Sequence, residues 1–286
     1  MCMSSAANER QARSFLEMIF KAAIPAPYLM DQLLAFSALH LSTLTDNTAE
    51  KQYYHYEASK LQTRALGAFN KASPEVSREN CMSMFFFSAI LNMSVFFDAM
   101  ITKSDFLDFL EKFIQFLTLQ RRIRAVTGPV WSIIRETDMR IILDPIEAAG
   151  ELQHEMSDIA DHCDQIINLL DTCSSSIGPT TVAVCRDTLQ SLKQVQSQYR
   201  CLSGPNREHL VMAWPALISE EFILLLKQRR QEALVIVAHW ATLLHFHRDL
   251  WVFGDTGQYL IASIAHFLGP SWTEWMSWPM EIIKGI

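Results

Sequence analysis

The sequence predicts an all-α protein, a multi-helix bundle of roughly ten to twelve helices with no significant β-sheet. Three observations carry this prediction. The 286 residues include only 9 glycines and 10 prolines, too few for the many turns of a β-sheet protein. Apolar residues recur at spacings of three and four, and sustained alternation of apolar and polar residues is absent. Half of the residues are apolar, enough to bury a large core.

Charge and cysteine usage exclude several classes of protein. The net charge of −7 and the isoelectric point near 5.7 argue against direct contact with nucleic acid, which usually requires a basic surface. No two of the six cysteines are two or three residues apart, so neither a zinc finger nor a Cys-x-x-Cys redox motif is expected. The longest apolar run, 82–97, is shorter than the roughly 20 residues that span a bilayer. We therefore expect a buried helix there and no membrane span.

The first third of the chain predicts three helices. Residues 28–44 and 49–71 both show helical spacing, and Ser73-Pro74-Glu75 is typical of a third helix start. That third helix contains the run 85–87 of three phenylalanines and is apolar on nearly every side, so we expect it to be central. In the first helix, one apolar stripe contains Leu29, Leu33, Phe36, His40 and Leu44.

The rest of the chain predicts further helices separated by breaks. Residues 104–125 are amphipathic, and Gly128-Pro129 is expected to end that helix. Residues 172–181 and 202–208 are rich in Ser, Gly and Pro and are expected to be mobile loops.

We expect one all-helical regulatory or ligand-binding domain over residues 1–286, with 1–25 as a partly ordered lead-in.

The stretch 238–255, AHWATLLHFHRDLWVFGD, concentrates the residues that carry chemistry. HRDL resembles a kinase catalytic loop, but the downstream Asn, the Gly-rich loop and the strand lysine of that motif are missing. His245 and His247 are two positions apart, so on a helix they project about 200° from each other and cannot chelate one ion. GxSxG, Walker and GxGxxG motifs are absent, and we expect no metal and no cofactor. A single catalytic histidine or carboxylate carries no motif and remains an open alternative.

An apolar and aromatic surplus remains, with 17 Phe, 13 Met and 7 Trp. Polar residues are scattered through the most apolar helices, which is the composition of a ligand pocket with apolar walls and a few orienting polar groups. A solid core, in which such polar residues bond to neighbouring helices, is the alternative for any one of them. For the set as a whole we favour a cavity.

Several segments resemble one known family. LLAFSALHLS within 28–42, the helix 53–70, and SRENCMSMFFFSAILNMSVFF at 77–97 are similar to the opening of the fungal-specific transcription factor regulatory domain. This domain is the C-terminal region of binuclear zinc cluster regulators such as sterol uptake control proteins. The aromatic-Gly segment within 233–269 and the W…WP motif within 271–283 resemble the family's closing helices. The resemblance spans about residues 28–283.

The resemblance implies an all-helical bundle in which some members bind a sterol in a hydrophobic pocket of the C-terminal half. It places Trp251, Phe253 and Gly254 near that pocket, and His239 and Leu243 on the surrounding helices. Together with residues chosen from composition, the expected ligand-binding set is Phe36, His40, Phe86, Asn92, His239, Leu243, Trp251, Phe253, Gly254 and Tyr259.

The chain also departs from the family, because the zinc cluster and the following coiled coil are absent from this sequence. We expect a regulatory domain that controls sterol or secondary-metabolite genes, acting in the nucleus, the cytoplasm or both. Its expected partners are a sterol-like, terpenoid or polyketide molecule, the transcription machinery or other proteins, and a second copy of the chain.

The alternative is a stand-alone protein of secondary metabolism, either a carrier or a cyclase or pericyclase-like enzyme that uses the same cavity. In such an enzyme, His239, His245 or Asp249 would supply a general acid, and holding an apolar substrate in a reactive shape would supply much of the acceleration.

Overall fold

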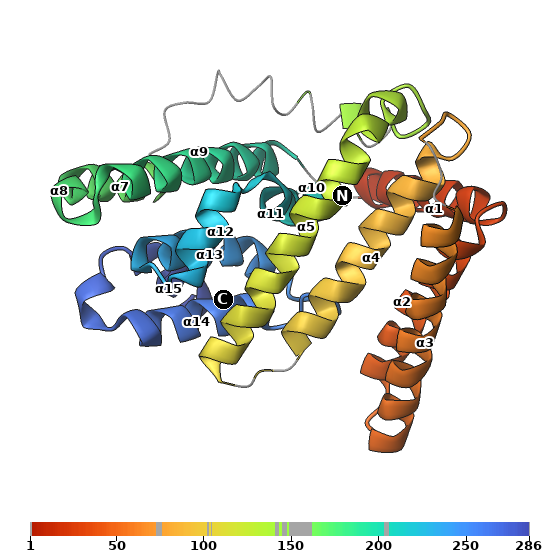
Figure 1. Cartoon of the computed structure of the whole chain (residues 1–286), viewed down its shortest axis with the longest axis horizontal. Coiled ribbons are helices and arrows are strands. Elements are labelled where there is room, and N and C mark those ends of the chain that lie inside the picture. Colours follow the sequence, from red (N-terminus) through yellow and green to blue (C-terminus); the bar gives the residue numbers. More distant parts are fainter. Residues whose placement is uncertain are drawn as a thin grey trace. The chain divides into compact units, whose positions relative to one another are not determined.

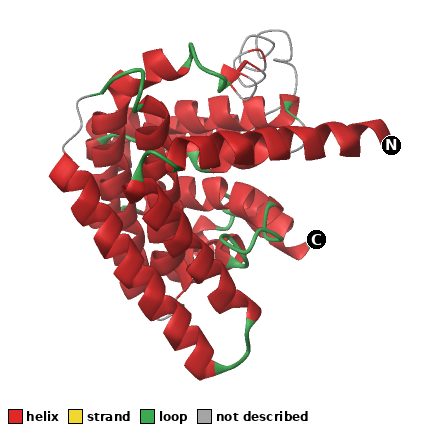
Figure 2. Ribbon diagram, turned by 90° about the vertical axis from the view of Figure 1, so that its right-hand side faces the viewer, coloured by secondary structure: helices red, strands yellow, loops and turns green. Residues whose placement is uncertain are grey.

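The computed structural model consists of helices and connecting loops, with no strand in the part of the chain that it describes (Figure 2). The prediction of an all-α protein is confirmed. The structure describes residues 2–72, 76–101, 103, 105–140, 143–144, 148, 162–202 and 206–285.

The chain divides into two compact units by its internal contacts. The first contains Met1–Asp98 and Arg122–Asp144, and the second contains Ala99–Arg121 and Pro145–Ile286. Helix α5, Phe106–Ile134, begins in the second unit and ends in the first (Figure 1). The expectation of one domain over residues 1–286 stays a prediction.

The first unit begins with α1 (Cys2–Ala23), α2 (Pro27–Leu44) and α3 (Thr48–Ala72), and α2 and α3 lie side by side (Figure 1). Both helices lie where the sequence predicts them. A bidentate ion pair joins them, because Arg64 donates to both carboxylate oxygens of Asp31, with an Nε–Oδ2 distance of 2.6 Å.

The buried face of α2 differs from the predicted stripe. Leu44 is 69% exposed, and the buried side is the neighbouring stripe. That stripe consists mainly of small and polar residues: Tyr28, Leu29, Gln32, Ala35, Ala38, Leu39 and Ser42. The physical reason is close packing of α2 against α3, because small buried side chains on both helices, such as Ala35 and Ala38 on α2 and Ala58 and Ala65 on α3, let the two backbones approach closely.

Helix α4, Cys81–Ile101, supplies aromatic side chains to the first unit. Phe86 and Phe87 are buried as predicted, and the ring of Phe87 stacks on Phe69 of α3 at 4.7 Å. The predicted helix start at 73–75 lies outside the described residues.

By length and composition α4 could cross a membrane, but half of its most apolar window is buried inside the structure, and core helices of soluble proteins share these properties. That the chain lacks a membrane span stays a prediction.

Helix α5 corrects one sequence prediction. Gly128-Pro129 was expected to end this helix, yet the helix continues to Ile134. An internal proline removes one hydrogen bond and crowds the preceding turn, a cost that packing of the rest of a long helix can offset. Phe109, Phe113 and Ile134 are fully buried, which indicates such packing on both sides of the break.

The second unit is built around α13, Gln231–Phe246, which contacts several neighbouring helices. The remaining elements of this unit are α7 (His162–Thr172), α8 (Ser174–Ile177), α9 (Pro179–Cys201), α10 (Asn206–Val211), α11 (Ala213–Leu217), α12 (Glu220–Lys227), α14 (Thr256–Leu268), the 3-10 turn η2 (Pro270–Trp272) and α15 (Ser277–Lys284).

Both expected loops differ in part from the structure. Residues 172–181 contain α8 and the first turn of α9, because Pro179 follows Gly178 as a helix start rather than extending a loop. In 202–208, residues 203–205 lie outside the described part and α10 begins at Asn206. The mobility of both segments stays a prediction.

Candidate functional site

The expected ligand-binding residues are divided between the two units. Phe36, His40, Phe86 and Asn92 belong to the first unit, where Phe86 is 1% exposed and the other three are half-buried. The remaining six belong to the second unit: His239, Leu243, Trp251, Phe253, Gly254 and Tyr259. The candidate site is therefore built from the second unit alone.

Helix α13 is a core helix. Every residue from Glu232 to His245 is buried, because other helices cover the apolar side chains on all faces. The indole of Trp240 stacks between the rings of Trp214 and Phe113, with centroid distances of 5.5 and 5.6 Å. Its N–H donates to the carbonyl of Val211 at 2.9 Å, so its polar atom is satisfied inside the core.

His239 is held in a buried polar network. Its Nε2 lies 3.0 Å from the carbonyl oxygen of Trp275, which fixes this nitrogen as the protonated one. Its own backbone carbonyl accepts from Thr242 at 2.8 Å and from Gln196 at 3.5 Å. Burial lowers the pKa of His239 to about 4, against the opposing effect of the Trp275 carbonyl. The imidazole is neutral at physiological pH and has a structural partner.

The indole of Trp278 on α15 lies between two imidazoles. Its ring is 4.5 Å from the ring of His162 on α7 and 5.4 Å from the ring of His239. These contacts join α15 to α7 and α13 and place a large aromatic side chain against His239. The aromatic residues of the closing W…WP motif therefore have a packing role in this unit.

His245 is 2% exposed, and neither ring nitrogen has a hydrogen-bond partner among the described residues. Burial lowers its pKa, and Arg248 adds to this effect. The backbone of α14 approaches closely here, because a Cβ atom on Gly257 would lie 2.5 Å from the backbone nitrogen of His245 and 2.6 Å from the carbonyl oxygen of Ala241. The glycine permits this helix crossing.

The kinase-like segment 247–255 forms turns between α13 and α14. Asp249 is exposed and Phe253 is 2% exposed, so their side chains lie in opposite environments. Gly254 has a φ of 46°, which a glycine adopts readily and which lets the chain turn towards α14. Among the described residues, no group of three or more His, Cys, Asp or Glu side chains is placed to hold a metal ion.

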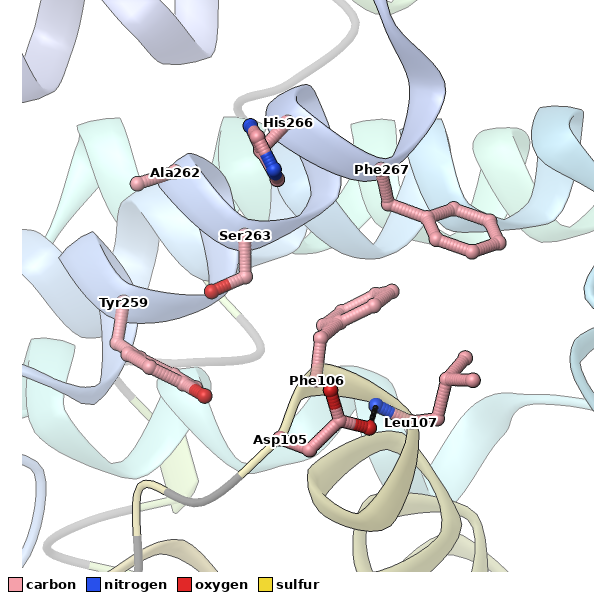
Figure 3. A pocket seen from close by; sticks show the side chains of 8 residues that line it. All are labelled: Asp105, Phe106, Leu107, Tyr259, Ala262, Ser263, His266 and Phe267. Atoms are coloured by element: carbon pink, nitrogen blue, oxygen red, sulfur yellow. Dashed lines mark hydrogen bonds between the residues drawn. The ribbon is translucent and has the colours of Figure 1, made fainter.

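A cleft of about 570 Å³ lies between the start of α5 and one face of α14 (Figure 3). The α5 side consists of Asp105, Phe106 and Leu107. The α14 side consists of Tyr259, Ala262, Ser263, His266 and Phe267. The spacing of these five residues, three and four apart, places them on one helix face, while Leu260, Ile261 and Ile264 turn the opposite face into the core.

Aromatic contacts hold the two sides of the cleft together. Phe106 and Phe267 face each other across it with ring centroids 5.2 Å apart (Figure 3), and Tyr259 meets the fully buried Phe109 at 4.8 Å. Asp105 caps α5, because its Oδ2 accepts the backbone N–H of Leu107 at 3.0 Å. The cleft thus combines aromatic walls with a carboxylate, two hydroxyls and an imidazole.

A comparison with known proteins adds a family to this geometry. Residues 2–127 match the model of the fungal specific transcription factor domain. The resemblance inferred from the sequence is thereby confirmed for this part, which contains Asp105, Phe106 and Leu107. No curated protein and no solved structure matches the chain. The match indicates a regulatory role in transcription and is consistent with a nuclear location.

Among the ten expected ligand-binding residues, only one lines the cleft. Tyr259 does so, whereas His239, Leu243 and Phe253 are almost fully buried elsewhere in the second unit. None of the three catalytic candidates, His239, His245 and Asp249, lines the cleft.

Sequence reasoning missed the other seven lining residues. The signal that marks four of them is the second face of α14, which lies opposite the buried Leu and Ile residues of the same helix.

Proposed function

We propose that this chain is a regulatory domain of a fungal transcription factor that senses a hydrophobic small molecule in the cleft on α14. The observation that supports the proposal is the cleft itself. Its volume of about 570 Å³ lies within the range of small-molecule sites. Its walls include three aromatic rings, and its few polar groups lie on both sides, with Asp105 beside α5 and the hydroxyls and imidazole along one face of α14, which suits orientation of a mostly apolar guest.

The position of the cleft suggests how a ligand would act. One side belongs to the domain matched at 2–127, and the other belongs to α14 in the last third of the chain. A molecule seated in the cleft beside Phe106 and Phe267 would contact both sides and would stabilise the arrangement in which these two rings meet. Binding energy available only in that arrangement is what shifts a conformational equilibrium.

We further propose that the regulated genes serve sterol or secondary metabolism, that the ligand is sterol-like, terpenoid or polyketide in size, and that the response passes to the transcription machinery in the nucleus. The C-terminal part of the family resemblance supports the sterol-like class. The catalytic candidates give the enzyme alternative no comparable support, because His239 and His245 are buried and Asp249 lies outside the cleft.

Native mass spectrometry of the full chain purified from a fungal host tests the proposal. We expect a retained apolar small molecule, lost in a Phe106→Ala, Phe267→Ala double variant because both walls are removed. The double variant Leu217→Ala, Leu224→Ala is the matched control, since it removes two exposed apolar side chains of the second unit away from the cleft. Retention of the same molecule by the cleft variant would contradict the proposed site.

A further inference from the structure

We infer that the cleft between Asp105 and α14 selects an organic cation, an amine that carries an apolar body. This inference rests on the proposed function, because it takes the same cleft as the ligand site and adds the charge of the ligand. It does not follow from the family match, which gives no ligand.

The charge of the cleft comes from Asp105. The eight lining residues include this carboxylate and neither lysine nor arginine. The carboxylate is positioned by the helix it caps, since Oδ2 accepts the backbone N–H of Leu107 at 3.0 Å. The Asp105 carboxylate therefore places a negative charge at a fixed position beside the aromatic side chains. The net charge of −7 of the whole chain adds to the preference for cations over anions.

The aromatic rings favour the same class of ligand. The faces of aromatic rings attract ammonium groups, and an apolar body gains contact area on Phe106 and Phe267. A carboxylate and aromatic rings that line the same cleft together match an alkyl or aryl amine. A sterol-like alcohol would use the rings and leave the carboxylate without a charged partner.

The second unit already contains an ammonium group placed beside both an aromatic ring and a carboxylate. The ammonium of Lys103 lies 5.9 Å from the centroid of the Tyr259 ring and forms an ion pair with Asp255. This arrangement of ammonium, carboxylate and ring is built on a residue that also lines the cleft. The ring of Tyr259 thus already has an internal cation beside it. Asp105 is the carboxylate that a cation from outside would meet in the cleft.

The test uses three probes with one eight-carbon body and three head groups: octylamine, 1-octanol and octanoate. Isothermal titration of the full chain at pH 7 and low salt measures each affinity. We expect octylamine to bind about five-fold tighter than 1-octanol, the upper range for a solvent-exposed ion pair, and octanoate to bind most weakly. Raising the salt concentration should reduce only the advantage of the amine.

Asp105→Asn should bring the affinity for octylamine down to that for 1-octanol and leave 1-octanol unchanged. Asp105→Glu keeps the charge and should retain most of the amine preference. Asp108→Asn is the matched control, because Asp108 lies one turn further along α5, pairs with Lys112 and does not line the cleft. It should preserve the preference.

The outcomes separate the two proposals. Equal affinities for octylamine and 1-octanol in the unaltered chain would overturn the cation inference and leave an apolar ligand site standing. Loss of the amine preference in Asp108→Asn as well would assign it to general surface charge and overturn the inference too. Binding of none of the three probes would overturn both proposals.

Discussion

Helices α13 and α14 are neighbours of similar composition, and their environments differ completely. Both are strongly apolar and both carry histidines, yet α13 is buried from Glu232 to His245, whereas α14 buries one face and exposes the other. The imidazole of His239 on α13 has a structural role, as its contact with the Trp275 carbonyl shows. Polar residues in an apolar helix thus indicate a ligand site only where one face of that helix remains exposed.

The largest expected effect is the loss of core packing around α13. Trp240→Ala removes a fully buried indole, its stacking on two rings and its hydrogen bond to Val211. We expect the free energy of unfolding of the second unit to fall by about 3 to 5 kcal/mol. Urea unfolding followed by circular dichroism measures this. A loss below about 1 kcal/mol would mean that α13 is not the core helix.

A pH dependence should follow from His239. Its folded pKa of about 4 lies below the usual value near 6.5, so between these values the unfolded chain binds the proton and the folded chain does not. Stability is therefore lost as the pH falls from about 6.5 to 4, by about 3 kcal/mol over this window.

The matched variant is His239→Gln, which keeps an N–H donor near the Trp275 carbonyl and lacks the titrating group. Its unfolding free energy should fall less steeply across this window. Identical slopes in the two proteins would assign the acid sensitivity to other groups.

The crossing of α13 and α14 should tolerate no side chain at Gly257. In Gly257→Ala the new Cβ meets backbone atoms of His245 and Ala241 at 2.5 and 2.6 Å, and backbone cannot move aside as a flexible side chain can. We expect a loss of about 1 to 3 kcal/mol in thermal or urea unfolding. Gly67→Ala on α3 is the control, because nothing lies within 4 Å of its Cβ and alanine favours helix. It should stabilise slightly.

The smallest effect on stability is expected in the cleft. Phe267 is 40% exposed, so Phe267→Ala should lower the free energy of unfolding by about 1 kcal/mol or less. The same variant should weaken binding of an apolar ligand. A stability loss as large as that of Trp240→Ala would show that the open face of α14 is in fact part of the core.

The sequence was sufficient to predict the all-α class and the limits of α2 and α3, because helical spacing is a local signal. It was insufficient for the buried face of α2, since a small residue such as Ala35 is fully buried there and the larger Leu44 is exposed. The sequence also predicted a wrong end for α5, because the helix continues past Pro129 to Ile134, where packing of the long helix outweighs the local cost of the proline.

The candidate site was the least predictable feature. Composition drew attention to the histidines of α13. Whether they are buried depends on how many other helices pack around α13, and the sequence of one segment does not determine that number. Tyr259 was the expected residue that the structure places in the cleft, and its neighbours at 262, 263, 266 and 267 follow from helical spacing once that face is known to be open.

The hydrogen bond between His239 and the carbonyl of Trp275 has a practical consequence for expression of shorter versions of this protein. A chain cut before residue 275 would lose the acceptor of the buried N–H of His239, together with the indole of Trp278 that packs against the ring. The resulting hole would open at the middle of α13. Shortened versions meant for biophysical work should therefore retain the segment through Lys284.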